Sequence, residues 1–190
     1  MNPTGTRRGF LTACLALATA RAKSAGHNPR VVLHIHAGGR SRKTHLHIPE
    51  RTLRASPPLV LALHGTGFTG EDMLDHYGWA AKAEREGFVV AAPDGVPLHP
   101  HLPSNLLANP HIWNAGQLDG KHAKRAEIDD LAFLKQLLGE LSIKMPYDPE
   151  RVYCVGHSNG GAMTFRLAAD SSRKLAGIGM VAGLMTVREP

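Results

Sequence analysis

The chain of 190 residues is 43% hydrophobic and 20% charged, which suits one globular domain with a core and excludes a disordered chain or a membrane bundle. The formal net charge is +6, but residues 1–26 hold four basic residues and no acid, so little net charge remains elsewhere. A second basic cluster, residues 121–125, precedes Glu127, Asp129 and Asp130, which is typical of a solvated loop. We therefore expect no nucleic-acid partner.

The N-terminus has the features of an export signal. Paired arginines, Arg7 and Arg8, directly precede an apolar stretch at 9–20, and small residues follow it. This stretch is too short to span a bilayer, which takes about 20 residues. Residues 1–25 therefore predict a twin-arginine-like signal peptide, a secreted or periplasmic protein, and no membrane attachment after its removal. A lipoprotein signal at Cys14 is the alternative, but it would leave too short an apolar region.

The hydrophobic pattern after the signal alternates between strand and helix. Polar and apolar residues alternate on both sides of Gly38-Gly39, which predicts an antiparallel hairpin. Short continuous apolar runs later in the chain indicate strands that are buried on both faces. The alternation predicts an α/β fold with a mostly parallel sheet and helices on both faces, in one domain over 29–190. In chain order, the pattern predicts strands at 30–37, 44–49 and 58–64, a helix at 71–86, a strand at 88–92, a loop at 96–120, a helix at 127–144, a strand at 151–155, a helix at 161–169 and a strand at 175–185.

A candidate nucleophile follows the strand predicted at 151–155. Residues 156–160 read GHSNG and match G-x-S-x-G between a predicted strand and a predicted helix, which is the context that this motif needs. Glycines suit the sharp turn because a Cβ there would clash with the neighbouring chain. The turn would lift the Ser158 hydroxyl above the sheet, where the N–H of Asn159 and the helix dipole favour negative charge on a substrate oxygen. We interpret Ser158 as a nucleophile.

A glycine-rich segment follows the first buried strand. Residues 64–67 read HGTG, and a backbone N–H at this position can complete an oxyanion hole beside such a serine. Thr66 is the expected donor, with Gly67 as the alternative. Together with Asn159, it would frame the oxyanion hole.

The order of several motifs resembles the polyhydroxybutyrate depolymerase and feruloyl esterase group of α/β-hydrolases. The resemblance covers residues 30–185, and its most specific part is the block DPERVYCVGHSNGG. Its other motifs are LHGTG, REGFVVAAPDG, WNAG and IDDLAFL. The resemblance implies the α/β-hydrolase fold and a secreted carboxylic-ester hydrolase that uses a Ser-Asp-His triad, with no metal and no cofactor.

The resemblance also implies roles for individual residues. It makes Ser158 the catalytic nucleophile, with Thr66 and Asn159 in the oxyanion hole. Trp113 and Asn114 fall in the loop that borders the site in such enzymes, and they are candidates for substrate binding. The implied partner is a small-molecule or polymeric ester.

The acid and the histidine of the triad are missing from the positions where the family has them. Asp129 and Asp130 precede the nucleophile, and we interpret them as helix-start residues because the family order is Ser, acid, His. No histidine follows His157, and Asp170 is the only aspartate after Ser158. Each βαβ unit takes roughly 30 residues, so about 60 more would be needed. We therefore expect a C-terminally truncated fold that lacks its last two strands and has little activity. The upstream candidates for a base are His64, His99, His101, His111 and His157.

Two other functions fit parts of the sequence. A serine peptidase of the same fold would use the same nucleophile, although no residue indicates peptide binding. A hairpin centred on residues 39–41 would pair His34 with His47 and His36 with His45, so a non-catalytic, His-rich metal-binding module is the second alternative.

Overall fold

The computed structural model describes residues 30–50, 56–116, 125, 127–171 and 174–185. The predicted signal peptide at 1–25 lies outside these residues. Within the described ranges, no helix is both long enough and apolar enough to cross a membrane.

The N-terminal hairpin forms as an antiparallel pair. It consists of β1 (Arg30–Ala37) and β2 (Arg40–His47). Gly38 and Gly39 make a two-residue turn with φ values of +58° and +70°, the left-handed values that this kind of turn requires. The second strand was predicted to begin at residue 44, and this boundary is wrong because the tight turn lets pairing resume at Arg40.

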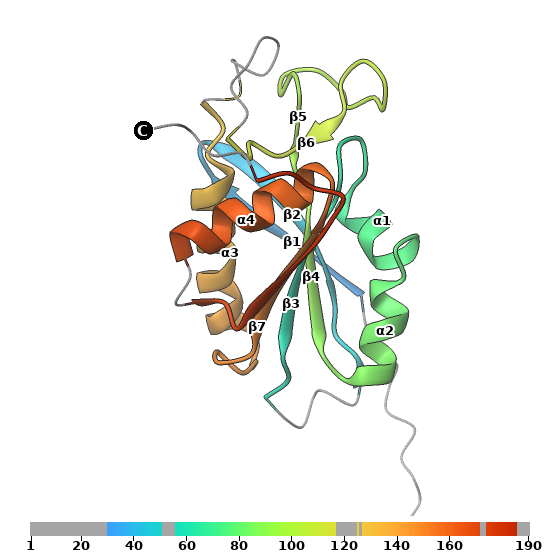
Figure 1. Cartoon of the computed structure of the whole chain (residues 1–190), viewed down its shortest axis with the longest axis vertical. Coiled ribbons are helices and arrows are strands. Elements are labelled where there is room, and N and C mark those ends of the chain that lie inside the picture. The colour runs from blue at the N-terminus through green and yellow to red at the C-terminus, as the bar shows by residue number, and fades with distance from the viewer. Residues whose placement is uncertain (1–29, 51–55, 117–124, 126, 172–173, 186–190) are drawn as a thin grey trace, which may run out of the picture.

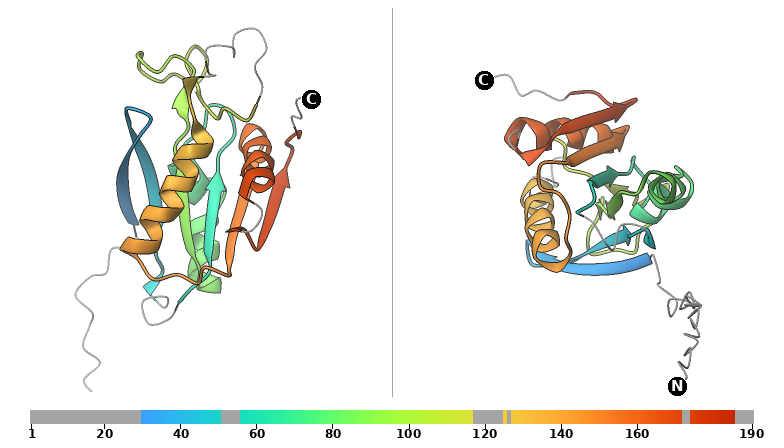
Figure 2. Two further views of the ribbon diagram at one scale, coloured as in Figure 1. Left: turned by 90° about the vertical axis from the view of Figure 1, so that its left-hand side faces the viewer. Right: turned by 90° about the horizontal axis from the view of Figure 1, so that it is seen from below.

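The described residues form a six-stranded sheet in the order β1-β2-β4-β3-β7-β8. Its parallel part contains β3 (Leu59–Leu63), β4 (Val89–Pro93), β7 (Val152–His157) and β8 (Gly177–Val181). β2 pairs antiparallel with β4, so the hairpin extends one side of the sheet, and β1 and β8 lie at opposite edges (Figure 2). The predicted mostly parallel sheet is confirmed.

Helices cover both faces of the sheet, as predicted (Figure 1). α1 (Gly70–Asp75) and α2 (Trp79–Glu86) lie on one face, and α3 (Asp130–Lys144) and α4 (Asn159–Ser171) lie on the other. The single helix predicted at 71–86 is wrong, because the chain breaks between α1 and α2 at Gly78, where φ is +74°.

The central strand β3 contributes to both hydrophobic cores. Leu59, Leu61 and Leu63 pack into the core on the side of α3 and α4. Val60 and Ala62 pack into the smaller core on the side of α1 and α2. Because both faces are covered, this strand needs apolar residues at successive positions rather than in alternation.

The long loop predicted at 96–120 contains two short strands, β5 (Val96–Pro97) and β6 (His111–Ile112), which pair antiparallel. Asn109 holds the loop between them, because its side-chain amide donates to three loop carbonyls and its oxygen accepts one amide. Arg125 is 1% exposed and donates to backbone carbonyls of both strands. The interpretation of the second basic cluster as solvated is therefore wrong for Arg125, while the rest of that cluster lies outside the described residues.

Candidate active site

Ser158 sits in a strained turn between β7 and α4. Its φ of +53° is rare for a residue with a side chain. A Cβ on Gly156 would lie 2.2 Å from the carbonyl oxygen of Gly160, and one on Gly160 would lie 2.2 Å from that of Leu63. The amide of Ser158 donates to the carbonyl of Val181 on β8 at 2.8 Å. The two glycines and this hydrogen bond together hold the serine in the geometry of a nucleophile elbow.

The turn after β3 lies directly beside this serine. A Cβ on Gly65 would be 3.4 Å from the Cβ of Ser158. The amide of Gly67 donates to the carbonyl of His111 at 2.8 Å and is therefore occupied. The amide of Thr66 has no hydrogen-bond partner in the described structure, and Thr66 is exposed. Of the two candidate donors, Thr66 is thus the one free to bind an oxyanion.

Asn159, the first residue of α4, is fixed by its side chain. Its Oδ1 accepts the amide of Trp113 at 2.6 Å, and its Nδ2 donates to the carbonyl of Trp113 at 3.1 Å. The Trp113 indole is fully buried and donates from Nε1 to the carbonyl of His64 at 2.9 Å. Trp113 therefore lies behind the site, where its backbone orients Asn159 and its ring supports the end of β3.

Asn114 connects the site to a buried group of charges. Its amide donates to Oδ2 of Asp130 at 2.7 Å, and its side-chain amide donates to the carbonyl of Arg125 at 2.8 Å. Arg166 on α4 donates to the backbone and side-chain oxygens of Asn114. Oδ1 of Asp130 accepts from Arg42 of β2 at 2.7 Å, so the charge network joins β2, α3 and α4 under the site.

The aspartates considered as triad acids have other positions. Asp129 caps α3 by accepting the amide of Ala132 at 2.9 Å, which confirms it as a helix-start residue. Asp170 lies near the end of α4 and forms an ion pair with Lys135 on α3. Asp130 also opens α3, but it is fully buried, and its ion pair with an arginine was not predicted.

His64 is the buried histidine beside the site, and both of its ring nitrogens are occupied. The amide of Gly95 donates to Nε2 at 2.8 Å, so the proton is on Nδ1, which donates to the carbonyl of Gly65 at 2.8 Å. Burial lowers the pKa of His64 to about 4. His64 is thus a neutral structural residue and cannot take the proton of Ser158 in this arrangement.

Two other candidates for the base already form hydrogen bonds, and Nδ1 of His111 donates to the carbonyl of Gly95 at 2.7 Å. His157 faces the segment between α1 and α2, where a 2.8 Å hydrogen bond joins its Nδ1 to the hydroxyl of Tyr77 beside an apolar hollow of about 260 Å³. Cys154 is fully buried, and burial raises the pKa of its thiol to about 12, so it remains an inert core residue. In the described part of the chain, the hydroxyl of Ser158 has no hydrogen-bond partner.

The hairpin histidines do not form the predicted metal site. The predicted pairs His34–His47 and His36–His45 are wrong, because the two-residue turn places Lys43 opposite His34. His45 and His47 are buried, whereas His34 and His36 are exposed on the edge strand. Among the described residues, no three His, Cys, Asp or Glu side chains form a group that could hold a metal ion.

A strained serine at a strand–helix junction, on a mostly parallel sheet with helices on both faces, defines the α/β-hydrolase fold. Solved structures agree with this class. An S-formylglutathione hydrolase from Staphylococcus aureus superposes with a TM-score of 0.61 at 15% identity, over 83% of this chain and 59% of that one. An acetyl xylan esterase from Aspergillus awamori superposes with a TM-score of 0.56 at 20% identity, over 80% of this chain and 53% of that one.

Curated relatives narrow the class to a group of esterases, although no protein-family model matches the chain. NocK of Nocardia uniformis subsp. tsuyamanensis, named as an esterase, is 33% identical over 149 residues, which are 76% of this chain and 39% of NocK. Poly(3-hydroxybutyrate) depolymerase of Ralstonia pickettii is 29% identical over 66% of this chain and 25% of its own. Feruloyl esterase B of Thermothelomyces thermophilus is 27% identical over 82% of this chain and 45% of its own. The chain is thus related to the esterase group that its sequence resembles, and it spans less than half the length of these relatives.

Proposed function

We propose that this chain carries the nucleophile half of a serine carboxylic-ester hydrolase, with Ser158 as the nucleophile. The observation that carries the proposal is the φ of +53° at Ser158, held between two glycines that have no room for a side chain. Such strain persists only where the surrounding structure enforces it, and it clusters at reactive sites. The esterase names of the relatives support the same reaction class.

In the proposed reaction, Oγ of Ser158 attacks the ester carbonyl carbon while a base takes its proton. The amides of Thr66 and Asn159 donate to the oxyanion that forms. The Thr66 amide has no other partner in the described structure, and the Asn159 amide lies at the N-terminus of α4. Collapse of this intermediate expels the alcohol, which takes the proton, and leaves an acyl group on the serine. Water then releases the acid and restores the hydroxyl.

The remaining site residues have supporting roles in this proposal. Trp113 and Asn114, which the resemblance connects with substrate binding, orient Asn159 from behind and connect it to the buried charges. The general base of the proposed reaction is neither His64, whose two ring nitrogens are occupied, nor His157, whose Nδ1 is bonded to the hydroxyl of Tyr77. Without that base, only weak catalysis would remain, on the order of 10³–10⁴ over water.

The substrate class and the location follow the relatives and the N-terminal sequence. Hydroxyalkanoate oligomers and feruloyl or acetyl esters of plant polysaccharide are the proposed substrates, since relatives carry these names. Residues 1–25 would direct export, so the proposed location is secreted or periplasmic.

Hydrolysis of p-nitrophenyl butyrate tests the proposal. The purified chain is compared with Ser158→Ala and with Ser142→Ala, an exposed serine of α3 that serves as a matched control. We expect Ser158→Ala to fall to the buffer rate, and Ser142→Ala to match the unmodified chain. Equal rates for all three proteins would refute Ser158 as a nucleophile in this chain.

A further inference from the structure

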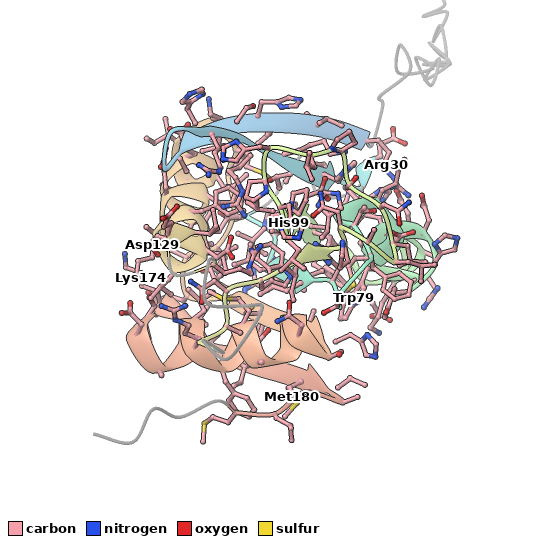
Figure 3. The ribbon with its side chains drawn as sticks, turned by 90° about the horizontal axis from the view of Figure 1, so that it is seen from above. Arg30, Trp79, His99, Asp129, Lys174 and Met180 are labelled. Atoms are coloured by element: carbon pink, nitrogen blue, oxygen red, sulfur yellow. The ribbon has the colours of Figure 1, made fainter. Side chains whose placement is uncertain are left out.

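A polar pocket lies beside the short strands β5 and β6. It has a volume of about 560 Å³ and is formed by the tip of the β1–β2 hairpin, the segment after β4 and the loop after β5. His111 is among the lining residues, and its backbone carbonyl accepts the amide of Gly67 at 2.8 Å. Figure 3 looks down on this region, with His99 on the loop that crosses between the hairpin and α4.

Three of the four charged residues that line this pocket are cationic. These are Arg40, Arg42 and Lys43, which all lie in the first half of β2. Asp94 is the single carboxylate among the described lining residues. It already faces Lys43 at 3.2 Å and accepts the amide of Gly70 at 2.7 Å. The pocket therefore keeps an excess of positive charge after its internal pairs are counted.

Asp94 also remains charged near neutral pH. Burial alone would raise its pKa, but His45 at 3.7 Å, the hydrogen bond from Gly70 and the charge of Lys43 together lower the pKa of this carboxyl well below its usual range. A carboxylate that is already held on several sides has little capacity left to cancel Arg40. It acts as an anchor for Lys43 rather than as a competitor for the pocket.

Arg42 gives the pocket a rigid, positively charged floor. It is 5% exposed, and its Nη2 donates to Asp130 at 2.7 Å and to the carbonyl of Asp94 at 3.2 Å. Its guanidinium carbon also lies 3.9 Å from the centroid of the Phe133 ring. Because these contacts fix the side chain before any ligand arrives, a ligand would lose little affinity to ordering it.

Arg40 lines the pocket and has hydrogen-bond donors that are available to a ligand. In the described structure its guanidinium makes a 3.4 Å hydrogen bond from Nη1 to the carbonyl of Gly38. Four further N–H groups of the fork are thus open, and a planar guanidinium suits the two oxygens of a carboxylate or phosphate. Ser104 and His101 also line the pocket, and both residues carry groups that can form hydrogen bonds.

We propose that this pocket binds a small oxyanion, the carboxylate or phosphate group of an acidic ligand, with Arg40 and Lys43 as its direct contacts. The site does not depend on the chemistry of Ser158. Its volume exceeds that of an inorganic anion, so it has room for an organic acid that carries the anionic group.

The test measures binding of two probes, 3-hydroxybutyrate and inorganic phosphate, at constant ionic strength. NMR shifts of the Gly39 and Arg40 amides follow occupancy, and the matched control is Arg85→Gln, an exposed arginine on α2. We expect saturable shifts with at least one probe. The affinity measured from them should be unchanged in Arg85→Gln and about tenfold or more weaker in Arg40→Gln, which loses charge-assisted hydrogen bonds. Arg40→Lys, which keeps the charge but not the fork, should fall between them.

The two probes separate the sources of the anion. Tighter binding of 3-hydroxybutyrate identifies a carboxylate ligand, and tighter binding of phosphate identifies a phosphate ligand; either result supports the site. The proposal is overturned if neither probe gives saturable shifts, or if Arg40→Gln binds as well as Arg85→Gln. Thermal melts of the three variants establish that each is folded before its affinity is compared.

Discussion

Replacing Asp130 by asparagine removes one negative charge from the network under the candidate site. Asp130 is fully buried and accepts from Arg42 at 2.7 Å, from the amide of Asn114 at 2.7 Å and from Arg125 at 3.5 Å. Asparagine keeps the size of the side chain, but it leaves two arginines, 5% and 1% exposed, without this counter-ion. Breaking a buried ion pair in this way costs about 3–5 kcal/mol.

That loss would be a large fraction of the free energy of unfolding, which is about 5–15 kcal/mol for a natural domain. For a chain of this size, the same change lowers the melting temperature by about 6–20 °C. Urea unfolding followed by circular dichroism measures the first quantity, and a thermal scan measures the second.

The neighbouring substitution Asp129→Asn is the matched control. It also removes one negative charge, but Asp129 caps α3 at the surface, and asparagine caps a helix about as well. We expect the control to unfold within about 0.5 kcal/mol of the unmodified chain. If Asp130→Asn were no less stable than Asp129→Asn, the buried charges would not hold the site as described.

Two further predictions concern the elbow and the histidine behind it. Gly160→Ala should lower the free energy of unfolding by about 1–3 kcal/mol, because its Cβ would meet the Leu63 carbonyl at 2.2 Å. Gly139→Ala, in open space within α3, should raise it by about 0.5–1 kcal/mol, and equal urea midpoints for the two would contradict the crowding. The pKa of His64 is lowered to about 4 by burial, so the unfolded chain binds a proton first as the pH falls, and stability drops between about 6.5 and 4. Between about pH 7.5 and about pH 5, the unmodified chain should lose about 2 kcal/mol more than His64→Gln, and parallel losses would count against this role.

The order of elements could be predicted because a strand that is buried on both faces needs a continuous run of apolar residues, which is visible in the sequence. The apolar run at Leu59–Leu63 indicates a buried strand, and the glycines at 38–39 indicate a tight turn. Boundaries were harder to place. The predicted helix at 71–86 breaks because Gly78 adopts a left-handed φ, and a single glycine inside a helical pattern is also compatible with a continuous helix.

The position of Ser158 could be predicted because the glycines around it leave so few conformations. The buried network of ion pairs and hydrogen bonds beneath it could not be predicted. Arg42 and Asp130 are 88 residues apart in the sequence, and nothing local distinguishes a buried arginine from a solvated one. Trp113 and Asn114 were predicted to border the site, and only tertiary contacts show that both are buried beneath it and bonded to Asn159, His64 and Asp130.

The hydrogen bond from the amide of Ser158 to Val181 ties the strained serine to a strand at the edge of the sheet. Edge elements open locally more often than central ones, and such openings are visible in amide hydrogen exchange. Each time β8 separates, the Ser158 amide loses its acceptor and becomes exchangeable with solvent deuterium. The exchange rate at the Ser158 amide would therefore report how often the hydrogen bond between this turn and β8 is open.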